Sequence, residues 1–262
     1  MNLRFIGFGN MARAIAQGLH NHSHNYQILA TAPSLKKEIT KEGIFTDSDN
    51  LAGLAEADLI VLAIKPAKMA EVLAQIKSKI PKNCLLISVA AGLSVDWLAQ
   101  HCCEGQTIIR AMPNLPVTIK QGATPLFANS QVSQEQKRFA EELFLSSGII
   151  AWVKDEIEID SLTALSGSGP AYVFYFLEAL IEAAKKLGLD EELAKDFTLQ
   201  TVAGAVAMAS DSDLGIAELR KKVTSPAGTT AAAIAILQEL KLSELISKAV
   251  EAAHARAKEL RI

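Results

Sequence analysis

The sequence has few aromatic residues, no long apolar run and little net charge, and each shortage excludes a class of protein. Aromatic residues make up 5% of the 262 residues although 50% are hydrophobic, so the core must consist mainly of Ala, Leu, Ile and Val. No run of about 18 apolar residues occurs, and we therefore expect no membrane span. A net charge of -3 gives no electrostatic basis for binding nucleic acid.

Cysteines are also scarce. Cys84, Cys102 and Cys103 are odd in number and lack the spacing of metal ligands, so we expect reduced thiols in a cytoplasmic protein. Met1–Asn10 lacks the basic region, apolar stretch and cleavage site of a signal peptide, which favours the same location.

The histidines offer no evident general acid. His20, His22 and His24 alternate in and beside a polar loop at residues 21–25. Their spacing is open to two interpretations, a metal site or a solvated surface turn. We expect the turn, and therefore no bound metal. His101 and His254 have no evident partner in the sequence.

The first half of the chain alternates short apolar runs with helical patterns. Such alternation is typical of βαβ units, and right-handed crossovers make a doubly wound, mainly parallel sheet the expected α/β fold. A helix is predicted over Met11–Leu19, and another over Ser133–Ser146 between two candidate edge strands, Ala123–Phe127 and Ile149–Val153. The other predicted strands are Leu3–Phe8, Gln27–Thr31, Leu59–Ile64, Leu85–Ala90 and Thr107–Met112.

The second half contains no convincing strand. Its predicted helices are Pro170–Leu187, Glu191–Ala209, Thr230–Leu240 and Ser243–Leu260. These helices are apolar on more than one face, which a domain of about 100 residues cannot bury alone. We therefore predict two domains, a dinucleotide-binding Rossmann-type domain at 1–157 and an all-α domain at 158–262 that forms a homodimer or a larger assembly.

A dinucleotide-binding fingerprint opens the chain. The residues Gly7, Phe8, Gly9, Asn10, Met11 and Ala12 fit G-x-G-x-x-A between a predicted strand and a predicted helix, which is the context that gives this pattern its meaning. Gly7 permits the tight turn, Gly9 lets the backbone approach a pyrophosphate, and Ala12 permits close packing of helix on sheet. The helix start supplies free N–H groups for the anion. The alternative is a glycine-rich turn without a ligand.

The end of the second predicted strand indicates the type of cofactor. An NAD site usually has an acidic residue there for the ribose 2′-OH. This chain has Thr31, Ala32 and Ser34 instead, followed by Lys36 and Lys37, which tolerates a 2′-phosphate. We expect NADPH to bind, with NADH possible but weaker. The lysines alternatively form an ordinary solvated helix start.

Two further strand ends are predicted to line the same crevice, because the carboxyl ends of parallel strands face the ligand. Ala63, Ile64, Lys65 and Pro66 end the third strand, where Lys65 can lay its stem against the cofactor. The small residues of Ser88–Gly92 leave room for a nicotinamide ring. Each segment alone is equally compatible with simple turn chemistry.

Three segments carry a resemblance to a known family. They are Ile109–Pro116 (IRAMPNLP), Leu165–Ala171 (LSGSGPA) and Val223–Thr230 (VTSPAGTT). With the fingerprint, their order and spacing resemble the pyrroline-5-carboxylate reductase family over nearly the whole chain. The resemblance implies hydride transfer from NAD(P)H to the imine carbon of a five-membered ring, which gives L-proline. It also implies a Rossmann domain and a helical domain that interlocks two subunits.

The resemblance also implies roles for individual residues. Residues Gly7–Ala12 correspond to the pyrophosphate loop. The implied cofactor contacts further along the chain are Asn50, Ala63, Ile64, Lys65, Pro66, Ala90, Ala91 and Glu156, with Ala90 and Ala91 near the nicotinamide. The implied substrate loop contains Ser225, Gly228, Thr229 and Thr230.

Three positions depart from the family pattern. Ala227 stands where many members have Gly, which matters little if its φ is negative. Lys222 stands where some members have Asn, so any role for it is in doubt. Ala32 stands where some members place a hydroxyl on the 2′-phosphate, which leaves Thr31 or Ser34 to bind that group.

The substrate loop has a chemistry that suits a cyclic imine bearing a carboxylate. Free N–H groups at the start of an Ala-rich helix suit the carboxylate, and the Thr230 hydroxyl is the expected contact of the ring nitrogen. The alternative is a purely structural role, in which Ser225 or Thr229 caps the helix. Solution can protonate the nitrogen before binding, so catalysis needs mainly orientation and electrostatics.

Three other activities are compatible with parts of the pattern. A nucleophilic serine at Ser166 or Ser168 is disfavoured, because the segment is not G-x-S-x-G. A dehydrogenase of 3-hydroxy acids would need a Lys and often an Asn on a helix after Gly169, and we find no such pair. A non-catalytic NADPH sensor would not need the loop at Ser225–Thr230.

Overall fold

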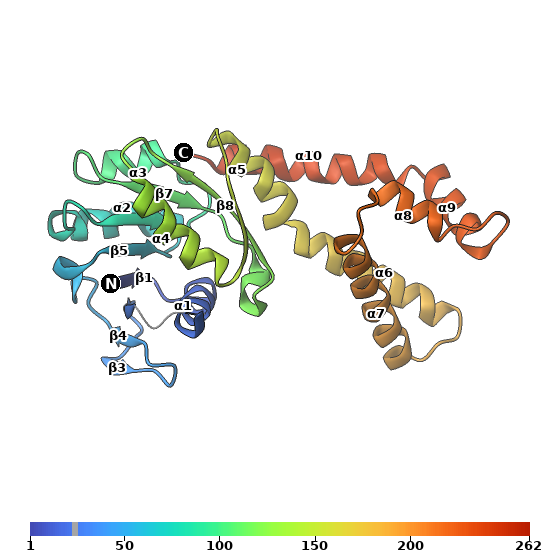
Figure 1. Cartoon of the computed structure of the whole chain (residues 1–262), viewed down its shortest axis with the longest axis horizontal. Helices are drawn as coiled ribbons and strands as arrows, with labels where there is room; N and C mark the ends of the chain where they lie inside the picture. The colour runs from blue at the N-terminus through green and yellow to red at the C-terminus, as the bar shows by residue number, and fades with distance from the viewer. Residues whose placement is uncertain (23–25) are drawn as a thin grey trace. The chain divides into compact units, whose positions relative to one another are not determined.

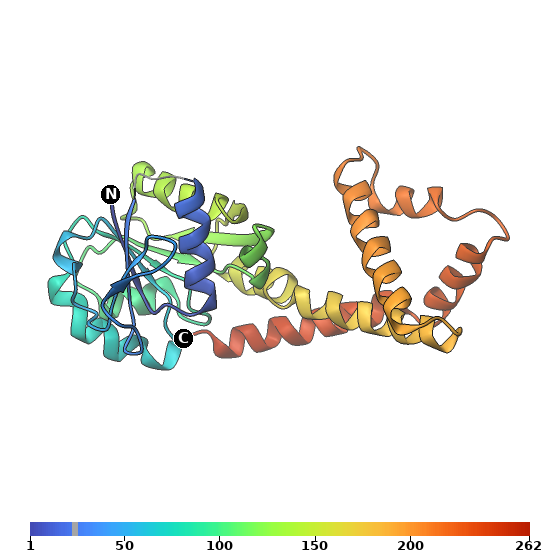
Figure 2. The ribbon, with the colours of Figure 1, turned by 90° about the horizontal axis from the view of Figure 1, so that it is seen from below.

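The computed structural model describes residues 1–22 and 26–262, and they form two compact units (Figures 1 and 2). The first unit contains Met1–Ser168 and Ala253–Ile262, and the second contains Gly169–Ala252. This division by contacts differs from the predicted boundary after residue 157, because residues 158–168 and the last ten residues pack with the first unit. The assignment of cofactor and substrate to 1–157 and 158–262 stays a prediction.

In the described residues of the first unit, nine strands form one sheet in the order β3-β4-β2-β1-β5-β6-β7-β8-β9. Neighbours run parallel except for β3 with β4 and β7 with β8. The strands are β1 Asn2–Ile6, β2 Gln27–Thr31, β3 Glu38–Ile39, β4 Phe45–Asp47, β5 Leu59–Leu62, β6 Leu85–Ser88, β7 Ile108–Ala111, β8 Gly122–Ala128 and β9 Gly148–Trp152. The predicted doubly wound, mainly parallel sheet is confirmed.

Two details of the sheet differ from the predictions. The segment Ala123–Phe127 belongs to β8, which is not an edge strand because it lies between β7 and β9. The short strands β3 and β4 were not predicted, because two or three residues are too few to show a hydrophobic period. Arg4 interrupts the apolar run of β1, and its guanidinium donates to the backbone oxygens of Leu3, Gln27 and Gly53.

Helices cover both faces of the sheet. Helices α1 (Asn10–His22) and α4 (Gln134–Leu145) bury their apolar sides on one face, against β1 residues Leu3 and Phe5. Helices α2 (Pro66–Ile76) and α3 (Val95–His101) cover the other face, against residues such as Ile6 (Figure 1). Alternate residues of a strand point to opposite faces, so the apolar runs supply both cores at once.

A short irregular helix precedes the point where the chain passes from the first unit to the second. Helix α5 (Ile157–Leu162) continues as a π-helix at Thr163–Gly167, where Ser168 N–H donates to the Thr163 carbonyl at 2.9 Å. The Ser166 hydroxyl donates to the Leu162 carbonyl at 2.8 Å. Asn114 joins this turn to β8, because its side chain donates to Ser166 O and accepts the Ala123 N–H. The hydroxyl of Ser166 is thus bound to backbone, which gives no support to a nucleophilic role.

Helices alone make up the described second unit (Figure 2). They are α6 Gly169–Lys186, α7 Glu191–Ser210, α8 Ile216–Lys222, α9 Thr229–Glu239 and α10 Leu242–Leu260, of which the last ends in the first unit. The seven residues of α8 were not predicted as a helix, whereas the other four were. Large apolar side chains remain exposed in this unit, including Phe174, Tyr175 and Phe197. The all-α character of the second half is confirmed.

The cysteines are not paired with one another. Burial raises the pKa of the Cys84 thiol to about 12, helped by the charge of Asp58. Burial raises that of Cys102 to about 12 as well, with a smaller effect of Cys103. Both thiols therefore stay protonated at neutral pH, which makes them poor nucleophiles.

Two histidines have partners that their sequence positions did not indicate. His101 stacks on Trp97 with ring centroids 3.8 Å apart, and its Nδ1 lies 2.8 Å from the Trp97 carbonyl oxygen. His254 Nε2 lies 3.3 Å from the Ser161 hydroxyl. His24 lies outside the described residues, and His22 is described only as the last residue of α1. The described part of the chain contains no group of three or more His, Cys, Asp or Glu suited to a metal ion.

None of the helices among residues 1–22 and 26–262 has the length and apolar composition that crossing a membrane requires.

Candidate active site

The carboxyl ends of the parallel strands bring most of the candidate cofactor residues to one edge of the sheet. The chain leaves β1 in one direction, through α1 to β2, and reaches β5 on the other side of β1. Such a reversal of strand order opens a crevice at the carboxyl ends of the two strands. The loop after β1 begins at Gly7, and the loop after β5 begins at Ala63, whose N–H donates to Ile6 O at 2.8 Å. The fingerprint therefore sits at the reversal point.

Gly7 is a position that only glycine fits. Its φ is +87°, and a Cβ there would overlap the Ala63 carbonyl oxygen. Its N–H donates to the Thr31 carbonyl at 2.8 Å, which ties the loop to β2 as well. Gly9 is different, because a Cβ there would meet no atom within 4 Å. The first glycine makes the turn and the second leaves open space over the loop, as the fingerprint predicts.

The start of α1 presents unused backbone donors beside that open space. The first hydrogen bond of the helix runs from Arg13 N–H to Gly9 O at 3.0 Å. The N–H groups of Asn10, Met11 and Ala12 bond to no described residue. Three free donors and the positive end of the helix suit an anionic group such as a pyrophosphate.

The side chains of two fingerprint residues are buried in the core and do not face the crevice. Phe8 and Ala12 are buried in the cluster beneath α1. The Arg13 guanidinium lies 4.7 Å from the Phe8 ring centroid and its Nε donates to the Phe8 carbonyl at 3.1 Å. Phe8 and Ala12 can therefore meet a cofactor only through backbone atoms.

The two hydroxyls predicted to bind a 2′-phosphate, those of Thr31 and Ser34, have different surroundings. The buried Thr31 hydroxyl lies 3.1 Å from Asn50 Oδ1 and 3.3 Å from the Phe5 carbonyl oxygen. Asn50 in turn donates to Gln75 at 3.3 Å. The structure brings Thr31 and Asn50 together, with the Thr31 hydroxyl turned toward protein acceptors. Ser34 is exposed and is the hydroxyl available to a phosphate.

An acidic residue near this pocket was missed from the sequence. Asp47 ends β4 beside Thr31 in the register, and the exposed Lys37 Nζ lies 3.8 Å from its carboxylate. The residues at the end of β2 include no acid, whereas the neighbouring strand β4 supplies one. No signal in the sequence indicated this acid, because β4 is too short to show a hydrophobic period.

The loops after β5 and β6 carry further residues that were predicted to contact the cofactor. Lys65 is the exposed residue that precedes α2, and Pro66 takes the first helical position, where its missing N–H costs nothing. After β6, the buried Ser88 hydroxyl accepts the Ala90 N–H at 3.3 Å. Ala90 is buried, while Ala91 is exposed.

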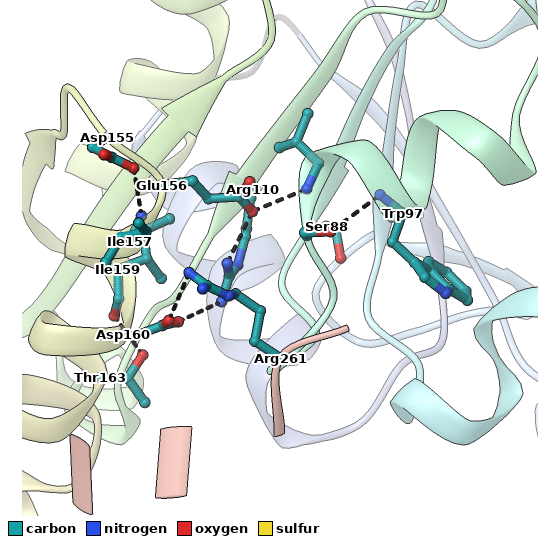
Figure 3. A network of polar contacts seen from close by, with 12 residues as sticks. Ser88, Trp97, Arg110, Asp155, Glu156, Ile157, Ile159, Asp160, Thr163 and Arg261 are labelled. Atoms are coloured by element: carbon teal, nitrogen blue, oxygen red, sulfur yellow. Dashed lines mark hydrogen bonds and ion pairs between the residues drawn. The ribbon is translucent and has the colours of Figure 1, made fainter. Parts of the chain in front are cut away.

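Glu156 is bound to protein groups in this structure (Figure 3). Its Oε1 lies 2.9 Å from Arg110 Nη1 and accepts the Val95 N–H at 2.9 Å. Arg110 is the residue that the sequence analysis passed over. An arginine within the apolar strand Ile108–Ala111 is the signal that should have prompted a search for a buried carboxylate partner.

The predicted substrate loop begins α9 in the second unit. Gly228 precedes the helix, and its carbonyl accepts the first helical hydrogen bond, from Ala232 at 3.2 Å. The N–H groups of Thr229, Thr230 and Ala231 bond to no described residue. No side chain caps the helix, so the alternative of a Ser225 or Thr229 cap gains no support. Thr230 is half-buried, whereas Lys222 lies exposed at the end of α8.

Ala227 adopts the conformation that the sequence analysis treated as the unfavourable case. Its φ is +60°, the left-handed region that costs an L-residue about 1–2 kcal/mol. The substitution of Gly by Ala at this position is therefore not neutral for the loop.

We expect Ala227→Gly to leave the free energy of unfolding unchanged or to raise it by about 1 kcal/mol. Removal of Cβ relieves the left-handed strain, and the greater freedom of glycine in the unfolded chain offsets about 0.4–1 kcal/mol of that gain. Ala233→Gly is the matched control, since it places glycine inside α9 and should cost about 1 kcal/mol. Urea unfolding measures both, and equal destabilisation by the two changes would contradict the strain.

Comparison with known proteins places the chain in one family. A model of pyrroline-5-carboxylate reductase dimerisation matches residues 156–260, and one of F420-dependent NADP oxidoreductases matches 2–92. The chain is 40% identical to the pyrroline-5-carboxylate reductase of Pseudomonas aeruginosa over 98% of its length and 96% of the relative. The reductase of Vibrio alginolyticus is 40% identical, with 98% and 97% covered.

Solved structures agree over the full chain. A pyrroline-5-carboxylate reductase from Coxiella burnetii superposes with a TM-score of 0.92 at 42% identity, covering 100% of this chain and 98% of the other. The Plasmodium falciparum pyrroline carboxylate reductase, solved with NADP bound, gives a TM-score of 0.89 at 33% identity, with 99% and 98% covered. On these matches, which extend from the glycine fingerprint through the helical second half, the chain belongs to the pyrroline-5-carboxylate reductase family.

Proposed function

We propose that this protein reduces 1-pyrroline-5-carboxylate to L-proline by hydride transfer from NADPH, the last step of proline synthesis. The full-length similarity to reductases of that name carries the proposal. The free donors at the starts of α1 and α9 support it, because the reaction needs one site for a pyrophosphate and another for a carboxylate.

The residues at the carboxyl edge fit a dinucleotide. Open space over Gly9 and three free N–H groups at the start of α1 match the needs of a pyrophosphate. Ser34 and the lysines after it would hold the 2′-phosphate, Asn50 and Ala63–Pro66 the ribose and linking groups, and Ala90 and Ala91 the nicotinamide. When bound, the cofactor supplies the hydride. The protein residues hold it in place and leave space for the ring.

The loop at Ser225–Thr230 is the proposed substrate site. The N–H groups of Thr229 and Thr230 would hold the carboxylate, with Ser225 and Gly228 shaping the loop, and the Thr230 hydroxyl would contact the ring nitrogen. That nitrogen arrives protonated from solution, so no histidine acid is required. Thr230 is accordingly the residue to which we assign the catalytic contact, through orientation of the reacting carbon.

Proline formation tests the proposal directly. The purified chain is given 1-pyrroline-5-carboxylate and NADPH, and we expect one L-proline for each NADPH oxidised, measured by absorbance and chromatography. Oxidation of 3-hydroxy acids with NADP⁺, without proline formation, would favour the dehydrogenase alternative. Tight binding of NADPH without proline formation and without oxidation of 3-hydroxy acids would indicate a sensor.

Cofactor preference should depend on Ala32. The N–H of Ala32 at the end of β2 donates to Asp47 O at 3.2 Å, and Ala32 lies two residues before Ser34, which we propose to hold the 2′-phosphate. In Ala32→Asp the new carboxylate repels that phosphate, so the ratio of NADPH to NADH affinity should fall about tenfold or more. Ala32→Asn is the uncharged control and should keep most of the preference. An unchanged ratio in Ala32→Asp would place the pocket elsewhere.

We also propose that the protein is a cytoplasmic homodimer or larger assembly, built through the helical domain at 158–262. The match to a dimerisation family and the exposed apolar side chains of the second unit support self-association. The interface should exceed the roughly 2,000 Å² typical of obligate pairs. Sedimentation at micromolar concentration should therefore find a dimer or a larger species. A folded and active monomer would contradict this.

A further inference from the structure

The loop after β6, residues 89–94, is paired with the segment that follows α10. The Ile262 N–H donates to Gly92 O at 2.8 Å, and the Ser94 N–H donates to Ile262 O at 3.0 Å. Gly92 is buried with a φ of +78°, and a Cβ there would overlap the Leu260 carbonyl oxygen. Two backbone hydrogen bonds and this close approach fasten the loop on one side.

Glu156 bonds to the backbone directly after this loop. A series of charged side chains connects Glu156 with the segment that follows α10. Glu156 accepts the Val95 N–H and pairs with Arg110, as described above. The other end of Arg110 reaches Asp160, with Nη2 and Oδ1 3.4 Å apart. Asp160 Oδ2 lies 3.0 Å from Arg261 Nη1, and Arg261 is the residue directly before Ile262. Figure 3 shows this polar network, which consists of Glu156, Arg110, Asp160 and Arg261.

The polar network is balanced in charge and largely buried. It contains two cations and two carboxylates. The side chains of Arg110 and Asp160 are each 2% exposed, that of Glu156 is 16% exposed, and that of Arg261 is 29% exposed. Buried ions hold a narrow geometry, because a displaced partner leaves an uncompensated charge in an apolar surrounding. The polar network therefore restricts the position of the loop after β6 more than the two backbone hydrogen bonds would alone.

We propose that Arg261 is a positioning residue for the reduction, acting through the loop after β6. That loop carries Ala90 and Ala91, the proposed nicotinamide contacts, so the inference rests on the proposed function. Arg261 forms an ion pair with Asp160 and directly precedes Ile262 in the chain. The backbone of Ile262 forms hydrogen bonds with Gly92 and Ser94. Fixing this loop sets the placement of the nicotinamide ring, on which the rate of hydride transfer depends. The affinity for NADPH depends mainly on the phosphate contacts at α1 and β2.

Arg261→Gln tests this inference without emptying the core, because Asp160 keeps Arg110 as a partner. The value of kcat for proline formation should fall about tenfold, while the Kd of NADPH should change by less than about threefold. The primary isotope effect measured with NADPH deuterated at the transferred position should rise, because hydride transfer becomes more rate-limiting. Arg261→Lys should recover part of the rate. Arg256→Gln is the matched control, since Arg256 lies on α10 and pairs with the exposed Glu259, and it should leave all three values unchanged.

A kcat and isotope effect in Arg261→Gln equal to those of the unaltered protein would overturn the inference. A lower kcat with an unchanged isotope effect, matched by a smaller folded fraction in thermal unfolding, would do the same, because it would show a structural role only. An unaltered protein that forms no proline would refute the proposed function, and the inference with it. Turnover in the unaltered protein, combined with no effect of Arg261→Gln, would refute the inference alone.

Discussion

Gly7→Ala is expected to lower the free energy of unfolding by about 2–5 kcal/mol and to abolish NADPH binding. The left-handed φ of +87° costs an L-residue about 1–2 kcal/mol. The new Cβ also overlaps the Ala63 carbonyl between β1 and β5, and forcing an extra carbon into a packed site costs about 1–3 kcal/mol more. The turn that aims the start of α1 would have to open. Thermal or urea unfolding and fluorescence titration with NADPH measure the two effects.

Gly9→Ala is the matched control for stability. The added Cβ meets no atom within 4 Å, so the free energy of unfolding should stay within about 1 kcal/mol of its original value. The affinity for NADPH should nevertheless fall at least about tenfold, because the methyl group occupies the space through which a pyrophosphate approaches the backbone. If Gly9→Ala binds NADPH normally, the open space over this loop is not the pyrophosphate site.

Thr230→Ala is expected to lower kcat/KM for proline formation about ten- to a hundredfold. The proposed hydrogen bond joins the hydroxyl to a charged substrate, and losing such a bond costs about 1.5–3 kcal/mol. The start of α9 should persist, since no side chain caps it. The Kd of NADPH should barely change, because the proposed cofactor residues lie in the first unit. Steady-state kinetics and a separate NADPH titration measure these values.

Thr230→Ser is the control for that experiment, because it keeps the hydroxyl and removes only a methyl group. It should retain most of the activity. Normal kcat/KM in Thr230→Ala, or a loss of NADPH binding in its place, would show that the loop is structural and that the substrate binds elsewhere.

Most of the long elements were predicted well, because each contains enough residues to show its hydrophobic pattern several times. A parallel strand covered on both faces is an unbroken apolar run, so β5 and β6 are visible without any other information. Apart from α2, which has 11 residues and was given no predicted range, the elements that were missed are short. Strands β3 and β4 and helix α8 depend on their neighbours, and two to seven residues cannot show a period.

The candidate site was predictable where its chemistry is local. Gly7 and Gly9 lie within one turn, so their pattern reports the geometry directly. The polar network pairs Arg110 with residues 46 and 50 positions away, and Arg261 lies further still along the chain, so only the fold brings these charges together. The left-handed φ of Ala227 was also invisible, because alanine carries no preference for that conformation.

The most direct test of the central claim follows the hydride. The protein is given 1-pyrroline-5-carboxylate and NADPH deuterated at the transferred position of the nicotinamide, and the proline formed is analysed by mass spectrometry and NMR. The proposed reaction puts one deuterium on the ring carbon bonded to nitrogen and remote from the carboxylate, the former imine carbon. Proline without deuterium, or with deuterium on the carbon that bears the carboxylate, would contradict direct hydride transfer to the imine.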